Sequence, residues 1–322
     1  MIADMVGSRK RCSWIHDSLM INPRGEVSAC CRQQPGVLGN IYENTLEEIF
    51  NGDRIKGFRR QEIEGTLHCV KGCNLDQKPQ VPDHVDGDYH NGVANLLIEF
   101  GEFCNVRCVM CVQDHDSRVE LDAEKLIQNI EIPKSCGRVW LYGGEPLVLK
   151  SAKRFFDHCA ASGTKVSFIT NGTAITEQMA AKIALHCKIV GFSLNAATKE
   201  IHETVNVGSQ FDRVLRNVRR VIDAKQELNG QVAIMGHMTI VKQNLHEIPL
   251  FISKRAEFGF EYLNFGFDHS VPGLLAKDPK MKERLASEVR TALAEDAKLA
   301  PTQKPHEHPR IGCSRLRLLD LA

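Results

Sequence analysis

The sequence has no long apolar run and almost no net charge. No stretch approaches the roughly 18 consecutive apolar residues of a membrane-spanning helix, and the first residues lack the apolar core of a signal peptide. The 41 basic and 40 acidic side chains leave a formal charge of +1, which gives no bulk attraction for nucleic acid or anionic lipid. We therefore expect a cytoplasmic protein that binds neither nucleic acid nor a membrane.

Arrangements typical of hydrolytic catalysis are also missing. No Ser-His-Asp set and no pair of carboxylates stands out, and His186, His202 and His246 lie in helical patterns where surface or hydrogen-bonded positions are expected. Cysteine, in contrast, is abundant, with 12 in 322 residues. In an intracellular chain this number indicates metal or redox use rather than disulfides.

Three of the cysteines, Cys104, Cys108 and Cys111, follow directly after the apolar run 95–101. Three thiolates can hold three irons of a [4Fe-4S] cluster, and one iron then stays open because a fully protein-bound cube needs four cysteines. A structural zinc site is the alternative, but such sites usually pair two C-x2-C hooks, and here only His115 lies nearby. The spacing favours a cluster with an open iron.

At these residues the chain resembles the radical S-adenosylmethionine (SAM) superfamily. Its members carry C-x3-C-x2-C after the first strand of a partial (β/α)6 barrel, and the resemblance implies that the open iron binds the amino and carboxylate groups of SAM. Further motifs in family order extend the resemblance from Leu96 to Asp268.

Strand-like and helix-like patterns alternate along residues 94–300. Apolar side chains recur on one face of 211–228, for example, as in an amphipathic helix. This alternation predicts an α/β fold with parallel strands and crossover helices, which suits the partial (β/α)6, TIM-like barrel with its chemistry at the C-terminal strand ends. The expected strands are 96–101, 138–142, 165–170, 189–194, 232–241 and 262–267.

Gly143, Gly144, Glu145 and Pro146 follow the second expected strand. Glycines permit close approach of the backbone to a ligand, and proline fixes the turn that follows, so a plain tight turn is also possible. The resemblance implies that this is the family's GGEP motif, which holds the SAM ammonium group through backbone carbonyls and Glu145.

The resemblance implies four more contacts with SAM. Asn171 lies in an Asn-Gly pair at the end of the third expected strand, where a simple turn is the alternative. Ser193 and Asn195 would share one face of the fourth strand, near the SAM carboxylate and ribose, although the family more often has aspartate at the second position. Met110 would meet the adenine through its backbone, where an aromatic residue is more usual.

Residues 1–76 are expected to form a small cysteine-rich α+β module. The pattern of 18–27 predicts a hairpin around a Pro-Arg-Gly turn, and Thr45 is a candidate N-cap for the helix that follows. The polar residues 77–93 indicate a linker to the barrel, and 301–322 a C-terminal tail.

Four cysteines of this module are candidate ligands of a second metal site. The spacing C-x12-G-x4-C from Cys12 to Cys30 is similar to the opening of SPASM and twitch modules, which bind auxiliary [4Fe-4S] clusters in radical SAM enzymes. Here the module precedes the barrel instead of following it, and it has cysteines for one cluster only. A structural zinc site is the alternative. The expected ligands are Cys12, Cys30, Cys69 and Cys73, with Cys31 as the alternative to Cys30.

The other cysteines carry weaker signals. Cys159 and Cys187 lie in helical patterns and are expected in the core. Cys313 lies in the tail, where some radical SAM epimerases place a hydrogen-donating thiol; an inert thiol is the alternative. The mixed-charge run 277–284 is expected on the exposed face of a last helix.

The resemblance implies reductive cleavage of SAM to a 5′-deoxyadenosyl radical, which abstracts a hydrogen atom from a small-molecule or peptide substrate in natural-product or modification chemistry. A reductant such as flavodoxin or ferredoxin is then a partner. Because an auxiliary cluster could accept an electron, we expect a net oxidation by dehydrogenation or bond formation. The alternatives are peptide epimerisation through Cys313 and a non-catalytic iron-sulfur or zinc-binding protein.

Overall fold

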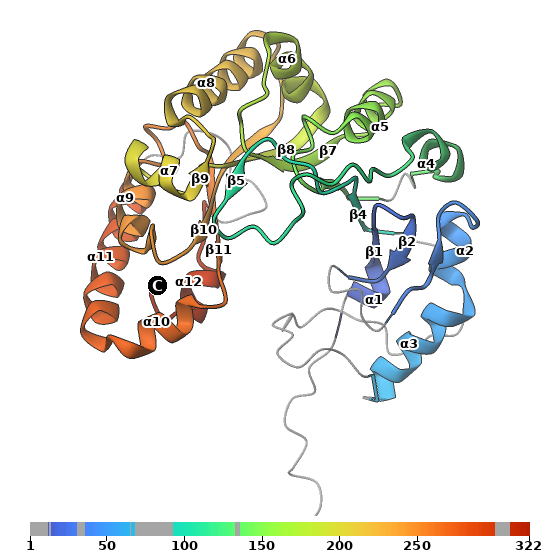
Figure 1. Cartoon of the computed structure of the whole chain (residues 1–322), viewed down its shortest axis with the longest axis horizontal. Coiled ribbons are helices and arrows are strands. Elements are labelled where there is room, and N and C mark those ends of the chain that lie inside the picture. The colour runs from blue at the N-terminus through green and yellow to red at the C-terminus, as the bar shows by residue number, and fades with distance from the viewer. Residues whose placement is uncertain are drawn as a thin grey trace, which may run out of the picture. The chain divides into compact units, whose positions relative to one another are not determined.

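The computed structural model describes residues 12, 14–30, 36–64, 66–67, 93–132, 136–299 and 310–322 (Figure 1). Contacts divide the chain into two compact units. The first unit runs through Met1–Gly101, Arg118–Gly143 and Leu149–Thr164, and the second through Glu102–Ser117, Gly144–Val148 and Lys165–Ala322. Within the described ranges, no helix combines the length and the apolar character needed to cross a membrane.

The first unit contains strands in the order β6-β4-β1-β2-β3. Strands β4 and β6 are parallel, while β1, β2 and β3 form an antiparallel meander. Its elements are α1 (Trp14–Asp17), β1 (Ser18–Ile21), β2 (Glu26–Ser28), β3 (Gly39–Asn40), α2 (Leu46–Asn51), α3 (Asp53–Glu64), β4 (Asn95–Glu99), α4 (Ala123–Asn129), β6 (Arg138–Tyr142) and α5 (Lys150–Ala161).

The predicted N-terminal hairpin and helix cap are both confirmed. Strands β1 and β2 pair through Met20 and Ser28, and Thr45 forms a capping box with Glu48 at the start of α2. One pairing was not expected, because β1 also lies parallel to β4, with Ser18 opposite Asn95. Strand β1 has only four residues, and three of them are buried. A pattern this short does not specify a partner strand, so the sequence could not predict this contact.

The second unit contains parallel strands in the order β7-β8-β10-β11-β12, and a separate antiparallel pair, β5 with β9. Its elements are β5 (Arg107–Cys108), β7 (Val166–Thr170), α6 (Glu177–His186), β8 (Cys187–Ser193), α7 (Lys199–Val205), β9 (Asn206–Val207), α8 (Phe211–Glu227), β10 (Ala233–Ile240), a 3-10 helix (Leu245–Glu247), α9 (Ile248–Ser253), β11 (Tyr262–Phe267), α10 (Val271–Lys277), α11 (Pro279–Lys298), β12 (Ile311–Gly312) and α12 (Ser314–Leu318).

The predicted α/β class with parallel strands and crossover helices is confirmed. The expected barrel strands correspond to β4, β6, β7, β8, β10 and β11, with ends that differ by at most two residues. Strand β12 was not predicted, because two residues of a presumed tail carry no strand pattern. The domain boundaries stay a prediction, and the linker falls almost entirely outside the described residues.

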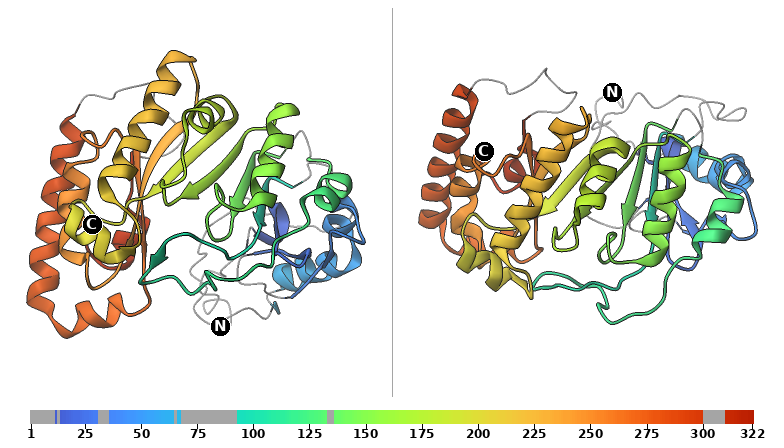
Figure 2. Two further views of the ribbon diagram at one scale, coloured as in Figure 1. Left: turned by 45° about the horizontal axis from the view of Figure 1, so that its top comes forward. Right: turned by 90° about the horizontal axis from the view of Figure 1, so that it is seen from above.

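Helices cover one face of the strands in the second unit. Phe251 of α9 packs against Phe265 of β11, with ring centroids 6.1 Å apart, and Phe192 of β8 contacts Phe260 at 6.3 Å. In Figures 1 and 2, α8, α9 and α11 lie along the outer side of these strands. Because strand side chains alternate between faces, the opposite face carries Ser193, His237 and Asn264. We call it the inner face.

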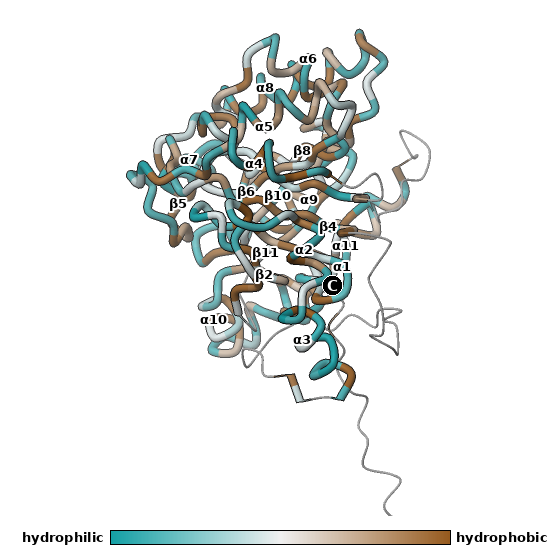
Figure 3. The backbone as a smooth tube through the Cα atoms, turned by 90° about the vertical axis from the view of Figure 1, so that its right-hand side faces the viewer, coloured by the Kyte–Doolittle hydropathy of each residue, from teal (hydrophilic) through white to brown (hydrophobic). Residues whose placement is uncertain are grey.

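Hydropathy follows this arrangement. Apolar segments run along β10 and β11, whereas α6 and α8 alternate between polar and apolar residues, as amphipathic helices do (Figure 3). Cys159 is buried in α5, as expected, and Cys187 is also buried but starts β8 instead of lying in a helix. Helix α6 ends at His186, and Cys187 is its C-cap in an extended conformation. The predicted helix was therefore one residue too long.

Candidate functional site

The three cysteines of the C-x3-C-x2-C motif lie in one loop of the second unit. Cys108 is part of β5 and pairs with Asn206 of β9, while the backbone N–H of Cys111 donates to the Cys108 carbonyl, with N and O 3.0 Å apart. At the start of the loop, the Cys104 N–H donates to the carbonyl of His115. Backbone hydrogen bonds at Cys104, Cys108 and Cys111 therefore fix the conformation of the loop that carries the predicted ligands.

The thiols of this loop influence one another. Burial, with smaller contributions from the neighbouring Cys104 and Cys111, raises the pKa of Cys108 to about 12. Burial also raises the pKa of Cys104, with an additional contribution from the Glu145 carboxylate. Thiolates at these positions need positive charge nearby, which iron ions would supply. The donor set therefore suits a cationic cluster.

Coordination of a single metal ion would require the ligand side chains to converge on one point. In the part of the chain that the structure describes, no three His, Cys, Asp or Glu side chains converge as ligands of one metal ion. A [4Fe-4S] cluster distributes its thiolates over different irons and therefore needs wider spacing. Ligation by Cys104, Cys108 and Cys111 stays a prediction, supported by the chemistry of the donors.

The GGEP segment lies against the start of the cysteine loop. A Cβ atom on Gly144 would lie 2.0 Å from the carbonyl oxygen of Phe103 and 2.4 Å from that of Glu102, so only glycine fits. The backbone N–H of Glu145 donates to the same Phe103 carbonyl at 3.0 Å. This close backbone approach holds the GGEP segment against the start of the cysteine loop.

Glu145 is buried, and its carboxylate is fully engaged by the protein. One oxygen accepts hydrogen bonds from the Thr170 hydroxyl at 2.6 Å and the Leu147 N–H at 3.1 Å, and the other accepts from the Asn171 N–H at 2.7 Å. Burial raises the pKa of Glu145, while these hydrogen bonds act in the opposite direction. The carboxylate fixes the GGEP segment to the end of β7, and its predicted contact with the SAM ammonium stays a prediction.

Asn171 lies directly beside the cysteine loop. Its Nδ2 donates to the Cys104 sulfur at 3.6 Å and to Asn105 Oδ1 at 3.0 Å, while its Oδ1 accepts from the Thr173 N–H at 2.9 Å. Hydrogen bonds to cysteine sulfur tune the potential of iron-sulfur clusters. The sequence predicted Asn171 as a SAM contact, and the structure adds a contact with a predicted cluster ligand.

Asn195 lies beyond the end of β8. The prediction that it shares a strand face with Ser193 is wrong, because β8 ends at Ser193 and Asn195 takes a left-handed conformation with φ of 57°. Its side chain donates to Asn206 Oδ1 at 2.8 Å and accepts from the Thr239 N–H at 2.7 Å. Asn195 thus connects β10 to β9, the partner of the cysteine loop.

Other predicted residues are placed as follows. Met110 is half-buried in the cysteine loop, and Pro146 is buried. Gly143 has φ of 127°, and a Cβ atom there would lie 2.3 Å from the Gly101 carbonyl. Cys313 is half-buried at the N-cap of α12, and burial raises the pKa of its thiol.

The candidate auxiliary ligands are only partly described. The Cys12 N–H donates to the buried carboxylate of Glu62, which also contacts His16 Nε2 at 3.1 Å. Cys30 is buried at the end of the hairpin, where its carbonyl accepts from the Ser28 hydroxyl. Cys31, Cys69 and Cys73 lie outside the described residues.

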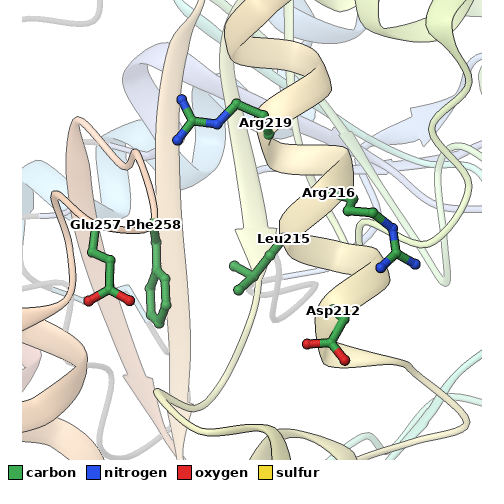
Figure 4. Close-up of a pocket in the computed structure, with 6 residues that line it drawn as sticks. All are labelled: Asp212, Leu215, Arg216, Arg219, Glu257 and Phe258. Atoms are coloured by element: carbon green, nitrogen blue, oxygen red, sulfur yellow. The ribbon is translucent and has the colours of Figure 1, made fainter.

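Sequence reasoning missed a polar group on the inner face. His237 and Thr239 of β10 lie on this face with Asn264 of β11, and all three are half-buried. The signal was present, because polar and apolar residues alternate along 236–240. On the helix-covered side, α8 and the segment after α9 line a hollow of about 510 Å³ that holds none of the predicted site residues (Figure 4). Its lining residues are Asp212, Leu215, Arg216, Arg219, Glu257 and Phe258.

Comparison with protein families gives two matches. Residues 98–252 match the model of the radical SAM superfamily, and residues 12–74 match that of an iron-sulfur cluster-binding domain known as SPASM. The second match covers the N-terminal cysteine module, in the order expected from the sequence.

Similar proteins include enzymes of several kinds. Over 170 residues, the chain is 28% identical to mycofactocin maturase MftC of Mycolicibacterium smegmatis, covering 51% of this chain and 42% of the relative. Over 152 residues it is 29% identical to Fe-coproporphyrin III synthase of Methanosarcina barkeri, covering 45% and 37%. The matched part spans less than half the length of these relatives.

Among solved structures, Streptococcus suis SuiB bound to the precursor peptide SuiA has a TM-score of 0.48 at 15% identity, covering 85% of this chain and 68% of that one. A likeness this weak adds nothing to the assignment.

Proposed function

Since this chain is a radical SAM enzyme with an iron-sulfur cluster-binding domain ahead of its radical SAM domain, we propose that it oxidises a peptide or small-molecule substrate by removing a hydrogen atom from carbon. The observation that carries the proposal is the contact between Asn171 and Cys104, which joins the end of β7 to the cysteine loop. The name of one relative, a maturase, favours a maturation reaction.

The cofactors are a [4Fe-4S] cluster and SAM, and the chemistry that they supply when bound is reductive cleavage of SAM followed by hydrogen-atom abstraction. In this proposal Cys104, Cys108 and Cys111 bind the cluster. Gly144 lets the GGEP segment pack against the Phe103 and Glu102 carbonyls, where its own backbone carbonyls would hold the SAM ammonium group, and Glu145 fixes the segment through its hydrogen bonds to the end of β7. Asn171 stabilises charge on the Cys104 sulfur.

The N-terminal domain is a cluster-binding domain, and we propose Cys12, Cys30, Cys69 and Cys73 as its ligands. An auxiliary cluster can accept the electron that remains on the substrate after hydrogen removal, which supports net oxidation. A flavodoxin- or ferredoxin-type protein would reduce the first cluster. If a variant with all four cysteines replaced by alanine formed oxidised product at the normal rate, this role would be excluded.

SAM cleavage tests the proposed class of reaction directly. Anaerobically reconstituted, dithionite-reduced protein should convert SAM to 5′-deoxyadenosine and methionine, and chromatography would detect both. A Cys108→Ala variant should form neither, while a Cys136→Ala variant should match the wild type because Cys136 lies in the first unit, outside the cysteine loop. Absence of 5′-deoxyadenosine from cluster-loaded wild type would refute the proposal.

A second candidate is peptide epimerisation. Cys313 is half-buried and directly follows Gly312 of the edge strand β12, which pairs with the inner-face residue Asn264 of β11. A thiol there could return a hydrogen atom to the substrate. Unchanged turnover by a Cys313→Ala variant would exclude it.

A further inference from the structure

The inner face of the second unit carries a row of polar side chains. In the strand register, Ser193 of β8 lies beside His237 of β10, and His237 lies beside Asn264 of β11. Thr239 follows two residues along β10 and therefore points to the same face. These four residues are half-buried and keep some accessible surface, whereas the residues that alternate with them on β10, Gly236, Met238 and Ile240, are buried. The row is thus accessible to a ligand.

Hydrogen bonds order three members of this row. Asn264 Nδ2 lies 3.3 Å from His237 Nδ1, and His237 Nε2 lies 3.2 Å from Thr239 Oγ1. With the amide group of Asn264 as donor, Nδ1 is the acceptor, so the network assigns the ring proton to Nε2 and makes Thr239 Oγ1 its acceptor. The hydroxyl hydrogen of Thr239 is then directed away from the ring, where it can donate to a bound group.

The row is uncharged. Burial lowers the pKa of His237 to about 4, so its ring is neutral near pH 7. The described residues at the inner-face positions of β8, β10 and β11 carry no ionised side chain at this pH; they are Ile189, Gly191, Ser193, Ala233, Met235, His237, Thr239, Tyr262, Asn264 and Gly266. Directly after β11, the Asp268 carboxylate accepts hydrogen bonds from the Ser270 N–H and hydroxyl. Strand positions without an ionised side chain disfavour a bound carboxylate or ammonium group and suit a neutral hydrogen-bonding group.

Space is available beside the imidazole ring. A Cβ atom on Gly266 would lie 3.7 Å from both His237 Cε1 and Thr239 Oγ1, which is ordinary contact, so glycine leaves this edge of the ring uncovered. The Thr239 N–H is bonded to Asn195, whose side chain reaches Asn206, the strand partner of Cys108. A short hydrogen-bonded path therefore connects the row to the cysteine loop.

We propose that His237, Thr239 and Asn264 bind a neutral amide or hydroxyl group of the substrate, and that they select such substrates over charged ones. This inference rests on the proposed function, because it concerns the substrate of the same reaction. Thr239 acts as the donor to the bound group, and Asn264 and His237 are positioning residues that orient its hydroxyl.

Protection of His237 from carbethoxylation tests this site without a known substrate. Reconstituted holoenzyme, saturated with SAM, is treated anaerobically with diethyl pyrocarbonate, and modification of each histidine is followed by peptide mass spectrometry. The probe is N-acetylglycinamide, used at roughly 50 mM because a ligand with so few atoms binds weakly. His246, which is exposed, is the internal control.

We expect the amide to slow modification of His237 several-fold and to leave His246 unchanged, while sodium acetate at the same concentration protects neither. Equal protection by acetate, or none by the amide, would overturn the proposal. Protection of His237 by SAM alone would also overturn it, because the ring would then belong to the cofactor site.

Two variants distinguish a binding role of Thr239 from a structural one. Thr239→Val, which matches threonine in size, should abolish protection by the amide, and Thr239→Ser, which keeps the hydroxyl, should retain it. Loss or retention in both variants would contradict the proposal. Formation of 5′-deoxyadenosine is measured on the wild-type sample, so that a failure of this inference is distinguishable from a failure of the proposed function.

Discussion

The carboxylate of Glu145 accepts a hydrogen bond from the backbone N–H of Asn171 at 2.7 Å, and the side chain of Asn171 donates to the sulfur of Cys104. Hydrogen bonds thus connect the GGEP segment, the end of β7 and the cysteine loop within the second unit of the chain. The connection means that replacing one of these residues affects both the cluster and the SAM cradle.

Replacing Glu145 with glutamine should destabilise the fold. The new amide group would place a donor against the Thr170 hydroxyl or the Asn171 N–H, leaving buried donors without acceptors. We expect the free energy of unfolding to fall by about 1–3 kcal/mol, measured by anaerobic chemical denaturation. Glu177→Gln, at an exposed position of α6, should change it by no more than about 0.5 kcal/mol. Equal effects of the two variants would contradict the role of Glu145.

Replacing Asn171 with alanine should make the reduction potential of the cluster more negative. The variant removes the N–H that donates to the Cys104 sulfur, and such hydrogen bonds stabilise the extra negative charge of the reduced cluster. A redox titration followed by electron paramagnetic resonance measures the shift. An unchanged or more positive midpoint would show that the bond does not reach a cluster ligand.

Replacing Gly144 with alanine should abolish SAM binding. The added methyl group would collide with the Phe103 and Glu102 carbonyl oxygens and force the GGEP segment away from the cysteine loop. Gly273→Ala is a matched control, because a Cβ atom there meets nothing within 4 Å in helix α10. Equilibrium dialysis with labelled SAM compares the two variants, and tight binding by Gly144→Ala would contradict the cradle.

His237 should make the protein sensitive to acid. The pKa of His237 is about 4 in the folded chain and 6.5 for an unperturbed histidine, as in the unfolded chain, so the unfolded chain binds more protons between these pH values. Its contribution to stability is therefore complete above pH 6.5 and is lost as the pH falls towards 4. The decrease in unfolding free energy between pH 7.5 and pH 5.5 should be smaller in His237→Gln, measured by chemical denaturation. Parallel curves for both proteins would show that the ring is well solvated.

The sequence was sufficient for the elements with strong local patterns. The strands alternate with amphipathic helices, and Thr45 caps α2 as its side chain predicts. It was insufficient where tertiary contacts decide. The apolar patterns of the short strands β1 and β4 do not specify that these strands pair in parallel. Asn195 leaves strand β8 because its hydrogen bonds to Asn206 and Thr239 hold it in a left-handed conformation.

The candidate site shows the same division. Motif spacing identified the cysteine loop and the GGEP segment, because their chemistry requires particular residues at fixed separations. The inner-face row of Ser193, His237 and Asn264 comes from three strands that are brought into register by the sheet. The spacing of these residues in the sequence does not indicate which of them are neighbours in the sheet, so the row could be identified only from the structure.

The central claim is that three cysteines hold a cluster with one open iron that binds SAM. Electron paramagnetic resonance of the reduced Cys69→Ala, Cys73→Ala double variant tests it most directly, since the auxiliary signal is removed. The claim predicts one cluster signal whose g-values shift when SAM is added, and no such signal once Cys108→Ala is introduced as well. A spectrum that SAM leaves unchanged, or a signal that survives Cys108→Ala, would contradict the claim.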